Sequence, residues 1–427
     1  MRSHKTALGG FIRTNHHHIR NAFLITSPQV ISVLVALFTL PATLNALLPK
    51  DYGLLQFVIA IQFWLCAFTA GNITIGSKKG VANGLDGTIL YAFFKRLYFF
   101  VPIGVVSLLV SGYFYFFTSQ AIFGILLAII SLYITVGYLP QVSYPEFLVA
   151  KKDFRELSFW QLATGILIPF LSMIAAVVSK DIVIFSGVQF GLITIISTIA
   201  FLRTLRKYNA WDSYGRGEID RSCYHYGIAL IPSEIILTTS TQLSSFIIGP
   251  LFGFASLATY SVASRIETSI RAFLRLPYNL FYADFARHDL GSLADKIRKN
   301  IAPFFAIAIL ASIGAGLIGI IYIHFFLPQD YSAAALYFVI LSLGFPAFIM
   351  QSILRTALEA TLRHKEINKL TLIVNFTKIA LIILLGSVFK VTGIVASAVI
   401  LTWAEFILYY HIVLSKNRYR NNGTLAR

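Results

Sequence analysis

Charged residues recur at helical spacing inside one otherwise apolar stretch, residues 254–276. They are Arg265, Glu267, Arg271 and Arg275. Residues four apart share one face of a helix, so Arg271 and Arg275 are neighbours, and Glu267 is predicted to form an internal ion pair with Arg271. Because a guanidinium group binds phosphate oxygens through two parallel hydrogen bonds, this basic face suits a phosphate-bearing ligand.

Arg265 lies about a dozen residues into this stretch, which places it near the middle of a membrane if the stretch is a spanning helix. An ionised side chain at that depth costs roughly 2.5–3.5 kcal/mol on insertion scales, so it usually faces a partner or a water-filled cavity. The arginines are therefore candidates for substrate binding. The alternative is that the span ends near Arg265 and that the rest forms an amphipathic cytoplasmic helix.

Three further ionisable residues interrupt apolar stretches. Lys378 and Glu405 each fall near the middle of one, and the two stretches would cross the membrane in opposite directions. They are predicted either to form a structural pair or to act on substrate or protons. Glu234 has no partner evident in the sequence. Burial disfavours a charged carboxyl group, so Glu234 is a candidate for proton coupling, the alternative being a structural carboxylate. The candidate coupling or structural carboxylates are Glu234, Glu267 and Glu405.

The elements that position these residues follow from the composition. The chain is 57% hydrophobic and 12% charged, with a mean hydropathy of +0.75, whereas soluble domains are about 45–50% apolar and about 25% charged. A spanning helix needs about 20 apolar residues, and the runs are continuous rather than alternating. The sequence therefore predicts an all-α integral membrane protein with about twelve spans, at residues 23–48, 54–71, 97–117, 122–141, 159–178, 182–202, 226–248, 254–276, 301–327, 333–353, 370–388 and 391–414.

The positive charges follow an alternating pattern along the chain. All but four of the 35 lysines and arginines fall in the two terminal segments or in every second gap and its edges; Lys78, Lys79, Lys95 and Arg96 are assigned to one such gap. By the positive-inside rule both termini are cytoplasmic, and the resemblance described below implies a bacterial cytoplasmic (inner) membrane. The formal charge of +17 is therefore read as a partnership with membrane lipids and not with nucleic acid.

The spans divide into two six-helix halves. We predict a cytoplasmic segment at 1–22, a first half at 23–202, a linker at 203–225, a second half at 226–414 and a basic cytoplasmic tail at 415–427. Six helices per half make the repeats parallel, and a central cavity is expected between the halves. The outer gaps are too short for a soluble active site, and no cofactor or metal site is expected.

Several short segments carry a resemblance to a known family. Residues 40–57 (LPATLNALLPKDYGLLQF) resemble the first-helix exit of bacterial O-antigen and polysaccharide flippases, members of the multidrug/oligosaccharidyl-lipid/polysaccharide exporter superfamily. Gly71 with the basic run at Lys78 and Lys79 is similar to the end of their second helix. Residues 246–249 and 258–266 resemble the connection of the seventh and eighth helices, and 393–398 resemble the opening of the last helix.

The resemblance implies a flippase that moves a lipid-linked, polyprenyl-pyrophosphate oligosaccharide across the membrane by alternating access, for surface polysaccharide assembly. The headgroup would meet Arg265, Arg271, Arg275 and Lys378, and a polysaccharide polymerase and assembly proteins would be partners. An ion or proton gradient is expected to drive transport, because the chain has no GxxxxGK[ST] run for ATP.

Three other functions stay open. The first is an ion-coupled multidrug or metabolite antiporter of the same superfamily, although cationic drugs would favour acidic cavity residues and the candidates here are mainly basic. The second is a membrane-embedded enzyme such as a polymerase or acyltransferase, which the short outer gaps disfavour. The third is a receptor-like binding protein, which would need a large ligand-binding domain.

Overall fold

A computed structural model describes residues 3–285, 290–360 and 364–414, with side chains except at 3–23, 25, 275–284, 290, 360 and 364–368. Every regular element in these ranges is a helix. The predicted all-α class is therefore confirmed. The predicted basic tail, residues 415–427, lies outside the described residues.

The described helices account for most of the predicted spans by length and apolar composition. Nine of the described helices are long and apolar enough to cross a membrane, and the bent pair α14 (Ala333–Ser342) and α15 (Phe345–Ala360) adds a tenth. The charged helix α12 (Phe254–Phe285) is 32 residues long, about 48 Å, which also suffices. Helix α16 (His364–Leu414) contains two spans, because Lys390 has non-helical dihedral angles and divides it. Counting α12 by its length and α16 as two spans brings the total for the described residues to twelve.

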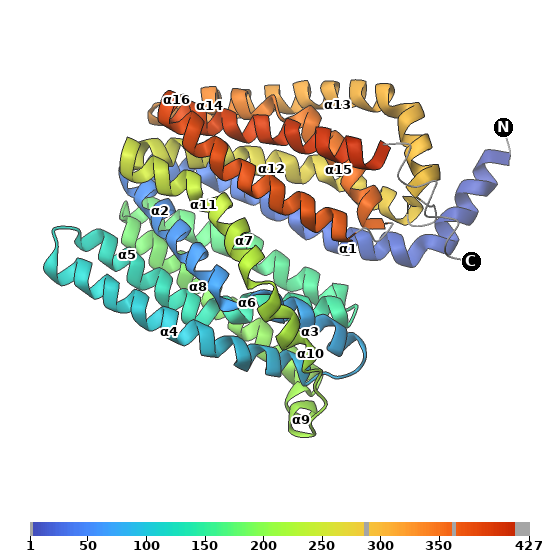
Figure 1. Ribbon diagram of the computed structural model, residues 1–427. Helices are drawn as coiled ribbons and strands as arrows, with labels where there is room; N and C mark the ends of the chain where they lie inside the picture. Colours follow the sequence, from blue (N-terminus) through green and yellow to red (C-terminus); the bar gives the residue numbers. More distant parts are fainter. Residues whose placement is uncertain (1–2, 286–289, 361–363, 415–427) are drawn as a thin grey trace. The chain divides into compact units, whose positions relative to one another are not determined.

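The chain divides into two compact units. Unit 1 contains Met1–Leu47 and Gln62–Glu234. Within it α1 runs along α7, α4 and α5 form a hairpin, and α7 packs beside α8 (Figure 1). Its elements are α1 (Ser3–Ala46), the end of α2 (Pro49–Cys66), the 3-10 turn η1 (Ala67–Thr69), α3 (Asn72–Ala82), α4 (Thr88–Phe117), α5 (Ala121–Leu132), the π-helical turn η2 (Tyr133–Tyr138), α6 (Leu139–Ala150), α7 (Phe154–Ser179), α8 (Ile182–Lys207), α9 (Ala210–Gly215) and α10 (Ser222–Ala229).

Unit 2 contains Leu48–Ile61 and Ile235–Arg427. Helix α12 packs against α14 and α15, and α15 also packs against α13 and α16. Besides these helices the unit holds most of α11 (Ile231–Phe252), α13 (Leu290–Phe326) and the turn η3 (Gln329–Tyr331).

The units divide the chain differently from the predicted halves at two places: residues 226–234 belong to unit 1, and residues 48–61, the start of α2, belong to unit 2. The reason is a close approach within that unit. A Cβ atom on Gly53 would lie 1.7 Å from the carbonyl oxygen of Phe254, so only glycine lets α2 meet the start of α12. Beside it the ring of Phe57 lies 5.5 Å from that of Phe254 and 6.3 Å from that of Phe246.

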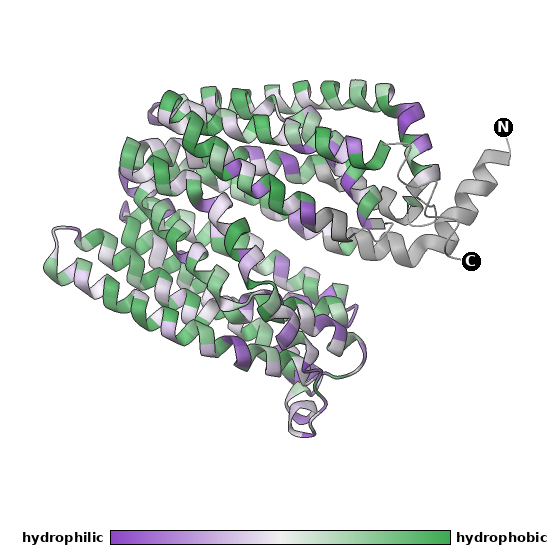
Figure 2. Ribbon diagram, viewed as in Figure 1, coloured by the Kyte–Doolittle hydropathy of each residue, from purple (hydrophilic) through white to green (hydrophobic). Residues whose placement is uncertain are grey.

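Each unit buries its own apolar core and still exposes many large apolar side chains. The core of unit 1 gathers around Leu90, Phe147 and Phe201, and that of unit 2 around Met350 and Leu354. Figure 2 shows hydrophobic residues along most of each long helix and hydrophilic ones around α9 and its loops. Such an exposed apolar surface needs lipid as its solvent.

Candidate functional site

A break in the second span creates the first candidate site, in unit 1. The turn η1 ends at Thr69 and is followed by Ala70, which is fully buried and left-handed (φ 51°), and α3 begins at Asn72. A helix interrupted inside a membrane leaves backbone groups without helical partners, so other groups must bind them.

Glu234 supplies that partner from the first turn of α11. The side-chain amide of Asn72 donates to Glu234 Oε2 at 2.9 Å. Gly71 leaves room for the carboxylate, because a Cβ there would lie 2.5 Å from Glu234 Oε1. The backbone amides of Gly71 and Asn72 also donate to Glu234. The sequence showed no partner for Glu234, because its partners lie 162 residues away at a break that hydropathy does not reveal.

A buried arginine lies near this carboxylate. Arg96 is 2% exposed, and its Nη1 donates to Thr74 Oγ1 at 2.7 Å while its Nε donates to the Thr69 carbonyl at 3.3 Å. Its guanidinium group also lies over the Phe100 ring, 5.2 Å from the centroid. Arg96 and Glu234 interact electrostatically, but the ion pairs described within 4.0 Å do not join them.

The assignment of Arg96 to a cytoplasmic gap was wrong. Helix α4 begins at Thr88, nine residues before the predicted span, so Arg96 lies within the helix and faces the core. The apolar residues just before Arg96, Ile89 to Phe94, were the sequence signal for this earlier start.

The second candidate site lies in unit 2 and joins residues of α12, α15 and α16. The predicted ion pair between Glu267 and Arg271 is present. The Arg271 guanidinium lies 4.7 Å from the centroid of Phe348 and donates to Thr402 Oγ1 at 3.4 Å. Glu267 is 8% exposed, so this pair is well shielded.

Glu405 has a neutral partner in the same region. The Gln351 side-chain amide donates to its carboxylate. Lys378 lies within electrostatic range of Glu405, Glu267 and Arg271, but the described ion pairs within 4.0 Å include none for Lys378. The structure thus brings four of the predicted residues together, and it supplies Gln351 and Thr402, which sequence reasoning did not select.

The other two predicted arginines stand apart from this cluster. Arg265 is exposed and donates from Nη1 to the Tyr52 hydroxyl at 3.4 Å. It is six residues from Arg271, which places the two side chains on different faces of α12. The backbone of Arg275 belongs to α12, but its side chain lies outside those described, so its role stays a prediction.

Neither cluster has the donor set of a metal centre. Within the part of the chain that the structure describes, no three His, Cys, Asp or Glu side chains gather where they could hold a metal ion.

Solved structures with the same arrangement of helices are transporters. A multidrug resistance MATE family transporter of the MOP superfamily, in its inward-facing conformation, aligns with a TM-score of 0.63 at 12% identity over 93% of this chain and 99% of its own. The chain has the MATE transporter fold. The MATE multidrug transporter DinF-BH (TM-score 0.61, 13% identity, 93% and 95% coverage) and the bent form of the Vibrio cholerae MATE transporter VcmN (0.57, 14%, 93% and 97%) agree.

This fold comprises twelve helices in two halves, as the sequence predicts. The MOP superfamily is also the exporter superfamily to which the sequence resemblance points. At 12–14% identity the similarity shows the fold alone. No protein-family model and no curated protein sequence matches the chain.

Proposed function

We propose that this protein is an ion-coupled antiporter of the multidrug or metabolite type, with Glu234 and Glu405 as its coupling carboxylates. The fold supports a transporter, and the similar structures are described as multidrug transporters. We further propose a bacterial cytoplasmic membrane as its location, from the sequence resemblance, with both termini cytoplasmic, from the charge pattern.

One observation carries the proposal: each unit holds a carboxylate inside a membrane span whose hydrogen-bond partner is a neutral amide. Asn72 binds Glu234 in unit 1, and Gln351 binds Glu405 in unit 2. An amide has both donors and an acceptor, so it can bind a carboxylate or a protonated carboxyl group. Such a carboxylate exchanges a proton or a metal cation without first breaking a contact ion pair.

A neighbouring cation couples this exchange of a proton or metal cation to the surrounding structure. Arg96 acts on Glu234, and Lys378 and Arg271 act on Glu405. Neutralising either carboxylate leaves these buried cations less compensated, which disfavours the surrounding packing. This differential stability is what an ion needs to shift a transporter between two states.

A second candidate function is the lipid-linked oligosaccharide flippase that the sequence resemblance implies. The observation in its favour is Arg271, a guanidinium group inside a spanning helix beside Phe348 and Thr402. Arg271 and Lys378 would bind the pyrophosphate headgroup, with Arg265 and Arg275 as the other candidate ligands. Polysaccharide polymerase and assembly proteins would then be its partners.

Transport by the purified protein in liposomes tests both functions. An imposed pH or Na⁺ gradient is expected to drive ethidium across the membrane, and Glu234→Gln is expected to abolish the response. Glu218→Gln is the matched control, because Glu218 pairs with Arg216 in an exposed loop of unit 1. Movement of a fluorescent lipid-linked oligosaccharide, without movement of ethidium, would replace the antiporter by the flippase. Equal fluxes with and without a gradient would refute ion coupling.

A further inference from the structure

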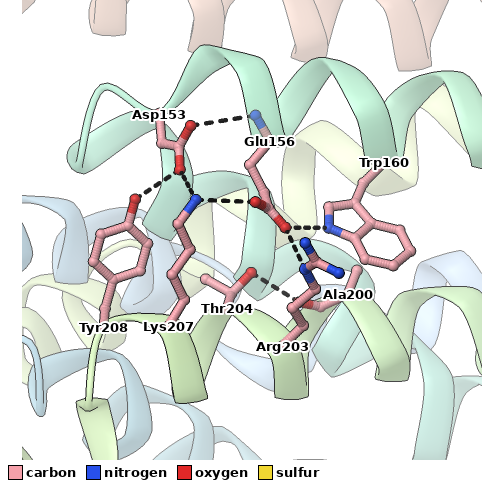
Figure 3. A network of polar contacts seen from close by, with 8 residues as sticks. All are labelled: Asp153, Glu156, Trp160, Ala200, Arg203, Thr204, Lys207 and Tyr208. Carbon is pink, nitrogen blue, oxygen red and sulfur yellow. Dashed lines mark hydrogen bonds and ion pairs between the residues drawn. The ribbon is translucent and has the colours of Figure 1, made fainter.

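One end of the α7 and α8 helix pair, in unit 1, carries a charged network. The Asp153 carboxylate caps α7 by accepting from the Glu156 backbone amide at 3.2 Å. Lys207 Nζ, at the end of α8, lies 2.6 Å from Asp153 Oδ2 and 2.9 Å from Glu156 Oε2. Figure 3 shows Arg203 and Trp160 on the other oxygen of Glu156, with Arg203 Nε at 2.9 Å.

The two carboxylates of this network are already bound. Burial by itself would raise the pKa of Asp153, but hydrogen bonds from Lys207, from the Tyr208 hydroxyl at 2.7 Å and from the Glu156 amide lower that pKa below its ordinary value. Asp153 therefore stays ionised at neutral pH, and Lys207 contacts both carboxylates.

The positive charges of the other cationic side chains are not fully neutralised within the network. Arg203 contacts Glu156 through Nε alone among its described contacts, and its side chain is 63% exposed. Arg206 and Arg155 are exposed, and the described ion pairs include neither. Four cationic and two anionic side chains thus line this region, which leaves an excess of positive charge.

An open groove of about 730 Å³ lies beside these arginines, with apolar side chains below them. Ile199 is 52% exposed and lies one turn before Arg203, and Leu202 is 43% exposed and lies one turn before Arg206. An adjoining cavity of about 330 Å³ extends past Phe159. One side of α8 therefore presents an apolar strip that ends in guanidinium groups.

The length of α8 sets the depth of this groove. Its 26 residues span about 39 Å, whereas the hydrocarbon core of a bilayer is about 30 Å thick. Asp181 caps the far end, accepting from the Val183 amide at 2.6 Å. A hydrocarbon core that begins at Ile182 ends about 20 residues later, near Leu202, so that Arg203, Arg206 and Lys207 fall at the layer of lipid phosphates and Ile199 at acyl-chain depth.

We propose that this groove binds one anionic phospholipid, with its phosphate on Arg203 and Arg206 and an acyl chain along Ile199 and Leu202. The guanidinium groups match a phosphate in charge and geometry. A zwitterionic headgroup would add a cation beside side chains that already carry excess positive charge. The proposal does not depend on the transported substrate.

Native mass spectrometry of the full chain in detergent tests the proposal, with dioleoylphosphatidylglycerol and dioleoylphosphatidylcholine as probes. Arg206→Gln is the first variant, because Arg206 has no described contact whose loss would affect folding. The control is Arg216→Gln, since Arg216 resembles Arg203 in exposure (61%) and in pairing with one glutamate. We expect one retained phosphatidylglycerol, bound about fivefold more weakly by Arg206→Gln and unchanged in the control.

A second variant, Arg203→Gln, is expected to weaken the same lipid by a similar factor, and thermal unfolding without added lipid verifies that it is folded. Binding of phosphatidylglycerol at wild-type strength by both variants would overturn the proposal. So would equal binding of phosphatidylcholine and phosphatidylglycerol by the wild type.

Discussion

Gly71→Ala is the sharpest perturbation of the break in the second span. The new Cβ would lie 2.5 Å from Glu234 Oε1, about 0.9 Å closer than an ordinary contact of 3.4 Å. The backbone at Gly71 has a φ of −49°, which alanine adopts without strain, so the side chain of Glu234 must move instead. That movement breaks the 2.9 Å hydrogen bond from Asn72. A hydrogen bond to a charged group contributes roughly 1.5–3 kcal/mol.

Thermal unfolding in detergent and gradient-driven transport together measure the effect. We expect a lower unfolding temperature, by roughly 2–4 °C for each kcal/mol in a unit of this size, and impaired coupling. Gly112→Ala in α4 is the control, because a Cβ there meets nothing within 4 Å. Wild-type stability and wild-type coupling in Gly71→Ala would refute the reasoning that the carboxylate is bound at the break.

Three further predictions concern the charged networks. Arg96→Lys is expected to reduce the yield of folded protein, measured by size-exclusion chromatography. The reason is that an ammonium group cannot reproduce the forked hydrogen bonds that the guanidinium group donates to the Thr74 hydroxyl and the Thr69 carbonyl. A normal yield would contradict this. The lowered pKa of Asp153 stabilises the fold above about pH 3.9, its unfolded value, and this contribution is lost as the pH falls through the folded-state pKa. Asp153→Asn should therefore flatten the acid side of the pH–stability profile, and an unchanged profile would count against the network. Glu405→Gln is expected to keep normal abundance but lose gradient-driven transport, since Gln351 can bind either side chain; low abundance would instead indicate a structural carboxylate.

The sequence predicted the fold well because a spanning helix is a local pattern. Apolar length located most of the spans, and the (i, i+4) spacing predicted the pair between Glu267 and Arg271. Both depend only on residues close together in the chain. The charge of Arg96 misled the prediction, because arginines usually lie in the loops between spans. Here α4 begins before Arg96, at Thr88, and the guanidinium group is bound inside the core.

The partners of the candidate carboxylates were not predictable in the same way. Asn72 reaches Glu234 only because the second span breaks at Ala70, a left-handed residue that is neither glycine nor asparagine. Gln351 on α15 and Glu405 on α16 are 54 residues apart in the sequence. The amide side chains of Asn72 and Gln351 carry no charge, so neither hydropathy nor charge counts identify them as partners of the carboxylates.

The most direct test of the central proposal is ethidium transport by the purified protein in liposomes under an imposed pH or Na⁺ gradient. We predict that the wild type and Glu218→Gln move the dye faster with the gradient than without it, and that Glu234→Gln shows no such response. A response in Glu234→Gln equal to that of the wild type would contradict the assignment of ion coupling to this carboxylate.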